Sequence, residues 1–263
     1  MPALGPALRP NQWVSRQTYL AIAAAWAVVV LLLWLFGAGF FPTPGRVFEA
    51  LGLLVSQGGL LGELLTSLTL FAEALAIAAL LSMGLAYLSV VPALRPIIGA
   101  LTKARFLSLV GLTFVFTMLV GGGHPLKLAL LVFGISAFLL TSMMDVVGSV
   151  PTEKLDHART LRMGDWRVVW EVVILGQMGL AFDALRQNAA IGWMMLTMVE
   201  GISRSEGGIG ALLMDQNKHF HLAGIIAIQG VFLIAGFFQD AFLAWLKSVL
   251  VPFAALATNR NQG

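Results

Sequence analysis

The sequence predicts an all-α, polytopic membrane protein with six transmembrane helices, on three observations. Hydrophobic residues make up 59% of the 263 residues, and the mean hydropathy is +0.89. Charged residues make up only 11%, whereas a soluble domain carries about a quarter. The apolar residues are gathered into long runs, and a helix requires about 20 such residues to cross a bilayer.

Six apolar runs are candidate spans: 19–37, 64–91, 106–120, 126–147, 172–199 and 222–251. The third run is short, and polar residues interrupt the fifth. The first run is longer than the roughly 7–15 apolar residues of a signal peptide, so we expect it to be retained as a span. Because no internal repeat or low-complexity linker divides the chain, we expect one transmembrane domain over residues 19–251.

The distribution of Lys and Arg predicts that both termini lie in the cytoplasm. With the N-terminus inside, eleven of the 16 basic residues fall in inside segments, four fall outside and Arg186 falls within a span. Such an excess of basic residues on the inside is typical of cytoplasmic loops. Residues 1–18, the loop 149–170 and the tail 252–263 are then cytoplasmic, and the loops 38–62 and 201–221 are external.

Each external loop is predicted to contain a short amphipathic helix. The turn Pro42-Thr43-Pro44-Gly45 leads into residues 46–55, whose apolar side chains share one helical face. Residues 205–210 are rich in glycine and predict a flexible hinge before a second amphipathic stretch, 211–220.

The cytoplasmic loop is the longest charged segment between apolar runs. Pro151 suits the first turn of a helix, and Glu153 lies near the positive end of its dipole. Gly164 is predicted to end this helix in the left-handed conformation, and Asp165 to cap the next one. One face carries Leu155, Ala158, Leu161 and Arg162. The loop is either a solvated connection or a rigid projection that fits a groove in a cytoplasmic partner.

Composition excludes several classes of function. The chain has no cysteine, which excludes disulfides and thiolate chemistry, and it has no phosphate-binding Gly-x-x-x-x-Gly-Lys-Ser/Thr sequence. Its four histidines are scattered, and His219 and His221 with Asp215 match no standard metal spacing, so we predict no metal. The pI of about 9.6 reflects orientation in the membrane rather than nucleic-acid binding.

The cytoplasmic loop resembles the "EAA" loop of ABC-importer permeases. From Pro42 to about Lys247, the chain resembles permeases of the nitrate/sulfonate/taurine/bicarbonate import family. The matching pieces are Phe41 to Val47, Gly121 to Lys127, Leu155 to Leu161 with Trp166, Leu185-Arg186, Trp193, Glu200 and Gly208-Ile209-Gly210.

Several positions depart from that family's pattern, so the EAA loop is divergent. The motif Glu is Asp156, its first Ala is His157, and Arg162 stands at the usual Gly, two residues before Gly164. Several prolines of the family's pattern are absent. Leu175 stands in place of the proline that opens span five, and Phe138 in place of one in span four. Ser108-Leu109 and Phe114 stand where prolines are expected in span three. These changes indicate an unusual ATPase partner, an unusual substrate or one half of a heterodimeric permease.

The resemblance implies the type I ABC-importer permease fold in a bacterial inner membrane. It implies four kinds of partner: two ABC ATPase subunits, a second permease copy or a paralogue, a periplasmic or extracellular substrate-binding protein, and membrane lipid, with no nucleic acid. The chain would be no enzyme and bind no cofactor, with ATP-Mg held by the ATPase. The ATPase-coupling residues would be Leu155, Asp156, Ala158, Leu161, Gly164 and Trp166, and the binding-protein docking residues would be Arg46, Arg204, Lys218 and His219.

Span five is the predicted pore-lining helix, although ordinary helix packing explains its polar residues equally well. Asp183 and Arg186 are three residues apart and can pair on one helix face; Arg186 is then either structural or a contact for an anion. Glu73 is predicted to pack between helices, protonated or bonded to a Ser or Thr. The expected pathway residues are Arg186, Gln187, Asn188, Trp193, Met194 and Thr197.

The predicted function is an importer permease for a small organic or inorganic anion of the sulfonate, nitrate or taurine kind. A self-contained secondary transporter or channel is the alternative, and it would need coupling-ion residues near the midplane, where Glu73 and Asp240 are the only candidates. A membrane enzyme is a third class, for which no nucleophile or cluster of His, Asp and Glu is evident.

Overall fold

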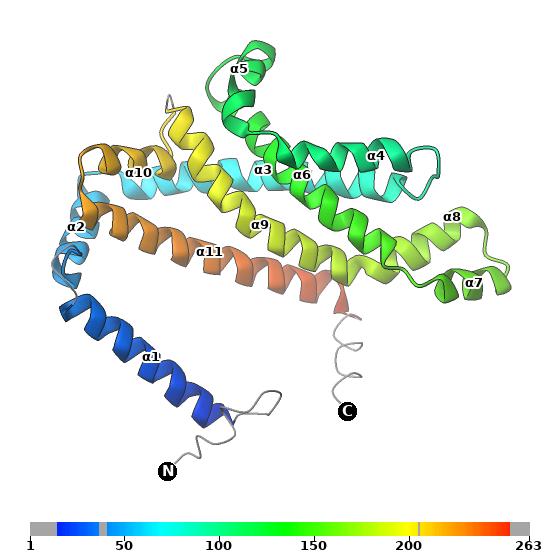
Figure 1. Cartoon of the computed structure of the whole chain (residues 1–263), viewed down its shortest axis with the longest axis horizontal. Coiled ribbons are helices and arrows are strands. Elements are labelled where there is room, and N and C mark those ends of the chain that lie inside the picture. Colours follow the sequence, from blue (N-terminus) through cyan, green and yellow to red (C-terminus); the bar gives the residue numbers. More distant parts are fainter. Residues whose placement is uncertain (1–14, 37–40, 205, 253–263) are drawn as a thin grey trace.

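The computed structural model describes residues 15–36, 41–204 and 206–252, which form helices without any strand. Four long helices run along an elongated bundle (Figure 1). They are α3 (Leu60–Leu88), α6 (His124–Gly148), α9 (Gly176–Ile202) and α11 (Leu222–Leu250). The predicted all-α class is confirmed.

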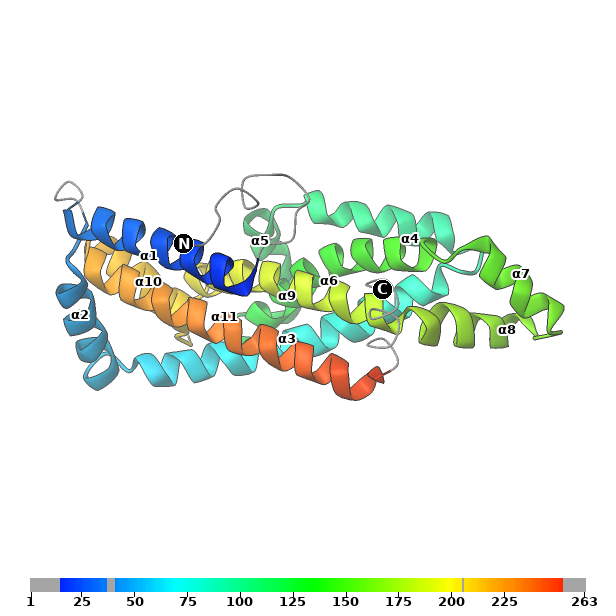
Figure 2. The ribbon, with the colours of Figure 1, turned by 90° about the horizontal axis from the view of Figure 1, so that it is seen from below.

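Shorter helices gather at the two ends of the bundle. At one end lie α2 (Pro44–Ser56) and α10 (Ile209–Lys218), and at the other lie α7 (Thr152–Thr160) and α8 (Asp165–Val168) (Figure 2). The two amphipathic helices predicted at 46–55 and 211–220 are therefore confirmed as helices. The remaining elements are α1 (Arg16–Phe36), α4 (Arg95–Leu101), η2 (Thr102–Phe106), α5 (Leu109–Val120) and η3 (Val169–Leu175).

Five helical segments of the described residues are long and apolar enough to span a membrane: 16–34, 60–88, 124–148, 165–202 and 222–250. A sixth is obtained if a bent pair of helices counts as one span. The bounds of these segments agree to within a few residues with those of the predicted runs, except for the third and fifth predicted runs. Residues 1–14, 37–40, 205 and 253–263, which include parts of the predicted cytoplasmic and external segments, lie outside the described residues.

The third predicted span, 106–120, is not a continuous crossing helix. Residues 95–106 and α5 meet at an angle of 111°, because Leu107 and Ser108 are extended, with ψ of 134° and 124°. The 12 residues of α5 rise only about 18 Å, less than the roughly 30 Å hydrocarbon core. Residues 95–120 therefore form two short helical arms, α4 with η2 and then α5, which are joined by an extended corner.

The fifth span begins earlier than predicted. Residues 165–202 form one continuous helical segment, in which a π-helical stretch, η3, joins α8 to α9. The helix expected after Asp165, which carries Trp166, Val169 and Trp170, is confirmed. The span predicted from residue 172 began too late, because that helix continues into the apolar run without a break. The charged connection between α6 and this segment is correspondingly shorter.

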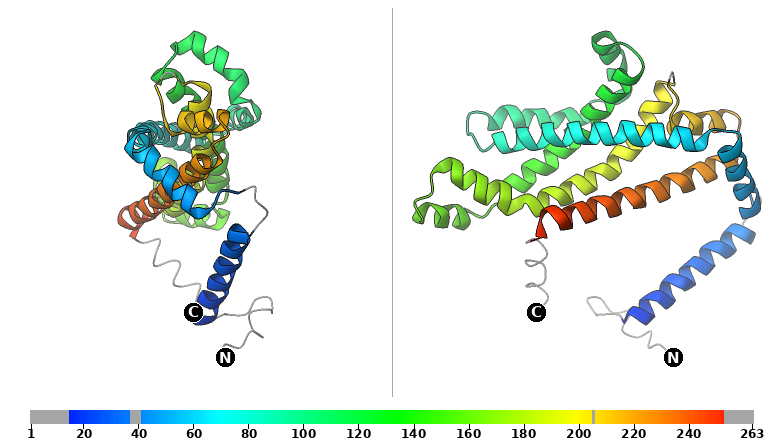
Figure 3. Two further views of the ribbon diagram at one scale, coloured as in Figure 1. Left: turned by 90° about the vertical axis from the view of Figure 1, so that its left-hand side faces the viewer. Right: turned by 180° about the vertical axis from the view of Figure 1, so that it is seen from behind.

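The core lies where α3, α6 and α9 pack together. Gly192 of α9 permits this close approach, because a Cβ there would lie 2.9 Å from the ring of Phe71 and 3.1 Å from Ile135. Small residues at such crossings are typical of membrane helices. By contrast, α1 stands apart from the other helices (Figure 3) and is hardly buried. Most of its apolar side chains are therefore exposed rather than packed against other helices.

Candidate functional site

Helices α9 and α11 are joined by two ion pairs. Arg186 donates from Nε to Asp240 Oδ1 at 2.8 Å and from Nη2 to Oδ2 at 2.5 Å. Lys247 Nζ donates to both carboxylate oxygens of Asp183, at 2.6 and 2.7 Å. The predicted pairing of Asp183 with Arg186 along one helix is therefore wrong, because each aspartate faces a cation of the other helix.

A groove of about 710 Å³ lies beside the Arg186–Asp240 pair, between α9 and α11. Four of the six predicted pathway residues line it: Arg186, Trp193, Met194 and Thr197. From α11 it is lined by Gln229, Phe232, Leu233, Gly236, Phe237, Gln239 and Asp240. The indole of Trp193 stacks on Phe71 with ring centres 5.1 Å apart and donates a hydrogen bond to Gln239 Oε1.

The other two predicted pathway residues do not line the groove. The Asn188 side chain is buried and donates to Ser142 Oγ at 2.9 Å and to the Ala184 carbonyl at 2.8 Å, so it joins α9 to α6. Gln187 is exposed but does not line the groove. The helical period explains this difference, because residues 186, 190, 193, 194 and 197 share one face whereas 187 and 188 turn away from it.

The predicted coupling residues surround α7. Ala158 is buried, and it lines a hollow with Val172 of η3 and Gly176 of α9. Leu161 and Trp166 are exposed, at 64% and 73%. Leu155 is partly buried, and Asp156 is exposed and accepts a hydrogen bond from Arg159 at 3.0 Å. Helix α7 therefore packs on the start of the fifth span, and the residues that follow it, Leu161 and Trp166 of α8, present large apolar side chains outward.

The end of α7 differs from its predicted form. Gly164 has φ −66° and ψ 152°, which is extended, whereas Arg162 has φ 54°. Arg162 N donates to the Arg159 carbonyl at 2.9 Å, and Met163 N donates to the Ala158 carbonyl at 3.3 Å. This is the Schellman motif, with arginine at the position that usually holds glycine. Asp165 is the first residue of α8, whose cap is Gly164, and it provides no side-chain cap.

Replacing Arg162 by glycine is therefore expected to stabilise the end of α7 by about 1 kcal/mol, since a left-handed conformation costs a side chain about that much. Hydrogen–deuterium exchange of the α7 amides should slow about fivefold. As the matched control, Gly164→Ala should leave this exchange unchanged, because Gly164 has a negative φ and nothing lies within 4 Å of a Cβ built there. Slower exchange in Gly164→Ala but not in Arg162→Gly would contradict the assignment.

A buried polar network lies at the opposite end of the bundle. Glu200 of α9 is 0% exposed and accepts hydrogen bonds from Ser67 Oγ at 2.6 Å and from Gly210 N at 2.8 Å. Ser67 Oγ also accepts from Ile209 N at 2.8 Å. Lys127 of α6 is 1% exposed and donates to the Gly207 carbonyl at 2.8 Å. Together with Glu63, which accepts from Gly208 N, these side chains attach the start of α10 to α3, α6 and α9.

The predicted flexible hinge at 205–210 is wrong for residues 207–210, because four of its backbone groups are bound by this network. In the sequence, Lys127 and Glu200 stand out only as parts of the resemblance. Sequence reasoning did not identify Glu63 or Ser67. The available signal was the presence of a lysine and two glutamates at the ends of apolar helices, where an unpaired charge is costly.

Glu73 and His124 are brought together by α3 and α6. His124 Nε2 lies 3.1 Å from Glu73 Oε2, and both side chains are about half exposed. The expectation that Glu73 bonds to a Ser or Thr is wrong, and His124, which had no predicted role, is its partner. The contact lies in the first turn of α6 and joins it to the middle of α3.

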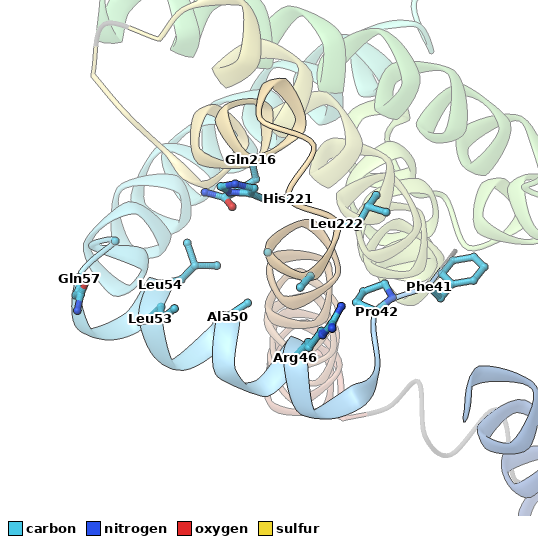
Figure 4. A pocket seen from close by; sticks show the side chains of 13 residues that line it. Phe41, Pro42, Arg46, Ala50, Leu53, Leu54, Gln57, Gln216, His221 and Leu222 are labelled. Atoms are coloured by element: carbon cyan, nitrogen blue, oxygen red, sulfur yellow. The ribbon is translucent and has the colours of Figure 1, made fainter. Parts of the chain in front are cut away.

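The four predicted docking residues all lie at the α2 and α10 end. Arg46 lines a pocket of about 660 Å³ between α2 and the start of α11, opposite Gln216 and His221 (Figure 4). Lys218 and His219 are exposed at the end of α10, and Arg204 follows α9. No three His, Asp or Glu side chains of the described chain are grouped closely enough to hold a metal.

Comparison with known proteins gives a distant relationship. No protein-family model matches the chain. The chain is 25% identical over 194 residues to the bicarbonate transport system permease protein CmpB of Synechococcus elongatus, which covers 72% of this chain and 69% of the relative. The same identity and coverage hold for CmpB of a second Synechococcus strain. Taken with the apolar helices, this similarity indicates a multi-pass membrane protein that is a distant homologue of a bicarbonate transport permease.

Proposed function

We propose that the chain is the transmembrane permease subunit of an ATP-driven importer. The observation that carries the proposal is the exposed projection of α7, which packs directly on the helical segment that continues into the groove. The similarity to a transport permease over most of the chain supports it. So does the resemblance of the α7 loop to the EAA loop.

Coupling would pass through α7 and α9. Exposed Leu161 and Trp166 would insert into a cytoplasmic ATPase, and buried Ala158 would transmit the movement to η3. Because residues 165–202 form one helical segment, a displacement of α7 would tilt the same helix that carries Arg186 and Trp193. This is a rigid-body switch between inward and outward access.

The proposed assembly contains two ATPase subunits, a second permease copy or paralogue, and an external substrate-binding protein. ATP-Mg would bind to the ATPase, and this chain would carry out no chemistry. The binding protein would dock at the α2 and α10 end through Arg46, Arg204, Lys218 and His219. Both termini would be cytoplasmic, as the distribution of basic residues predicts.

The test is affinity purification of the tagged chain from its native host in mild detergent, with quantitative mass spectrometry of the co-purified proteins. The wild type is expected to recover an ABC ATPase, and a Leu161→Ala/Trp166→Ala variant to recover at least tenfold less. Phe220→Ala is the matched control, because Phe220 is equally apolar and exposed but lies at the other end of the bundle. Recovery of the chain alone, under conditions that preserve a known importer, would favour a self-contained secondary transporter or channel.

A further inference from the structure

One face of α9 and α11 carries charged and polar side chains within two helices that are long enough to span the membrane. Asp183, Arg186, Asp240 and Lys247 all lie on this face and keep between 24% and 53% of their side-chain surface exposed. Charged side chains inside a bilayer face water or protein rather than lipid. The α9–α11 face therefore lines an aqueous pathway or a partner surface.

The charge of the groove on this face is balanced. Arg186 is the only cation among the described residues that line it, and both its Nε and Nη2 are bound to the Asp240 carboxylate. The guanidinium keeps N–H groups that the carboxylate does not bind, but an anion bound to them would lie close to the negative charge of Asp240. Asp240 therefore acts as a repulsive element against anionic ligands, the kind of element that gives binding sites their specificity.

The remaining lining suits a flat ring. Phe232 packs edge-on against Trp193, with ring centres 5.4 Å apart. Phe237 and Met194 are about two-thirds exposed and offer their surfaces to a ligand. Aromatic rings and methionine sulfur both interact favourably with aromatic groups.

Hydrogen-bonding groups stand beside these apolar surfaces. The Thr197 hydroxyl donates to the Met194 carbonyl, which leaves its oxygen able to accept. Gln239 uses its carbonyl oxygen to accept from Trp193, which leaves its amide nitrogen able to donate. The Gln229 amide offers both a donor and an acceptor. Sites that hold a few such groups within an apolar groove recognise small organic molecules.

We propose that the α9–α11 groove binds an uncharged, ring-containing organic molecule that forms hydrogen bonds, rather than a small anion. This proposal deepens the proposed function, since it names the class of substrate for the same pathway. The anion contact predicted for Arg186 is then replaced by a structural role, in which Arg186 holds Asp240 and closes one end of the groove.

The test uses nicotinamide and nicotinate, which share a ring and differ in having a neutral amide or a carboxylate. Binding of nicotinamide and of nicotinate to the full chain in lipid nanodiscs is measured by saturation-transfer NMR. Bicarbonate, which has no observable proton, and taurine are titrated as competitors of the nicotinamide signal. Saturable binding of nicotinamide, at least tenfold tighter than that of the other three, is expected. Trp193→Ala and Phe237→Ala should each weaken it at least fivefold. Trp245→Ala is the matched control, because Trp245 is exposed on α11 outside the groove.

A charge variant tests the role of Asp240 directly. In Asp240→Asn the guanidinium of Arg186 loses its carboxylate, so nicotinate should bind at least as tightly as nicotinamide. Phe237→Ala keeps the test informative if Trp193→Ala fails to fold, since Phe237 is largely exposed. The proposal is overturned if the wild type shows no saturable nicotinamide binding, prefers any of the anions or taurine, or keeps its preference in Asp240→Asn. None of these results alters ATPase co-purification, so failure of the two proposals can be distinguished.

Discussion

Replacing Gly208 by valine is expected to lower the free energy of unfolding by about 4 kcal/mol, at the upper end of single-residue effects. Gly208 has φ 108°, which costs a β-branched residue several kcal/mol. A Cβ there would also collide with the carboxylate of Glu200. The network would lose the contacts of Ser67 and Gly210 to that carboxylate. Thermal unfolding in detergent should show the midpoint fall by about 10 °C.

Gly59→Ala separates backbone strain from the collision. Gly59 also has a positive φ, 64°, but nothing lies within 4 Å of a Cβ built there, so alanine should cost only about 1 kcal/mol. If Gly59→Ala and Gly208→Val lower the midpoint equally, the contact with Glu200 contributes nothing and the network is wrongly assigned. An intermediate loss in Gly208→Ala is also expected.

Hydropathy predicted most of the fold, because a helix that crosses a bilayer must be apolar over about 20 residues. The positions of α3, α6 and α11 follow from this requirement alone. It could not predict the corner at Leu107 and Ser108, because both halves of that segment are apolar and hydropathy carries no information about ψ. It also placed the start of the fifth span too late, since the charged residues Asp165, Arg167 and Glu171 make the first turns of that helix resemble a loop.

The candidate site was predicted less completely, because its contacts join residues far apart in sequence. Helical periodicity places Arg186, Trp193 and Thr197 on one face, and these do line the groove. The same periodicity suggested an Asp183–Arg186 pair, since it gives no information about which helix packs alongside. Similarly, Gly164 was chosen as the left-handed residue by its identity, whereas the position at which α7 ends places that conformation at Arg162.

Lys127→Met is expected to lower the free energy of unfolding by about 3–5 kcal/mol, the usual cost of leaving a buried charge without its partner. Lys127 supplies positive charge near Glu200 and holds the Gly207 carbonyl, and methionine fills similar space without either function. The melting midpoint should fall by about 6–12 °C, whereas Lys218→Met, at an exposed position, should leave it unchanged.

The double variant Lys127→Met/Glu200→Gln decides whether charge is the cause. If Lys127 acts by neutralising Glu200, Lys127→Met should cost less in the Glu200→Gln background, by about 1–2 kcal/mol of coupling. In Glu200→Gln, the glutamine oxygen can still accept from Gly210 N, and the amide nitrogen can donate to Ser67 Oγ, whose hydroxyl can accept as well as donate. Strictly additive losses would mean that Lys127 serves only to hold the Gly207 carbonyl. The attachment of α10 to the spans would then depend on backbone contacts rather than on a buried pair of opposite charges.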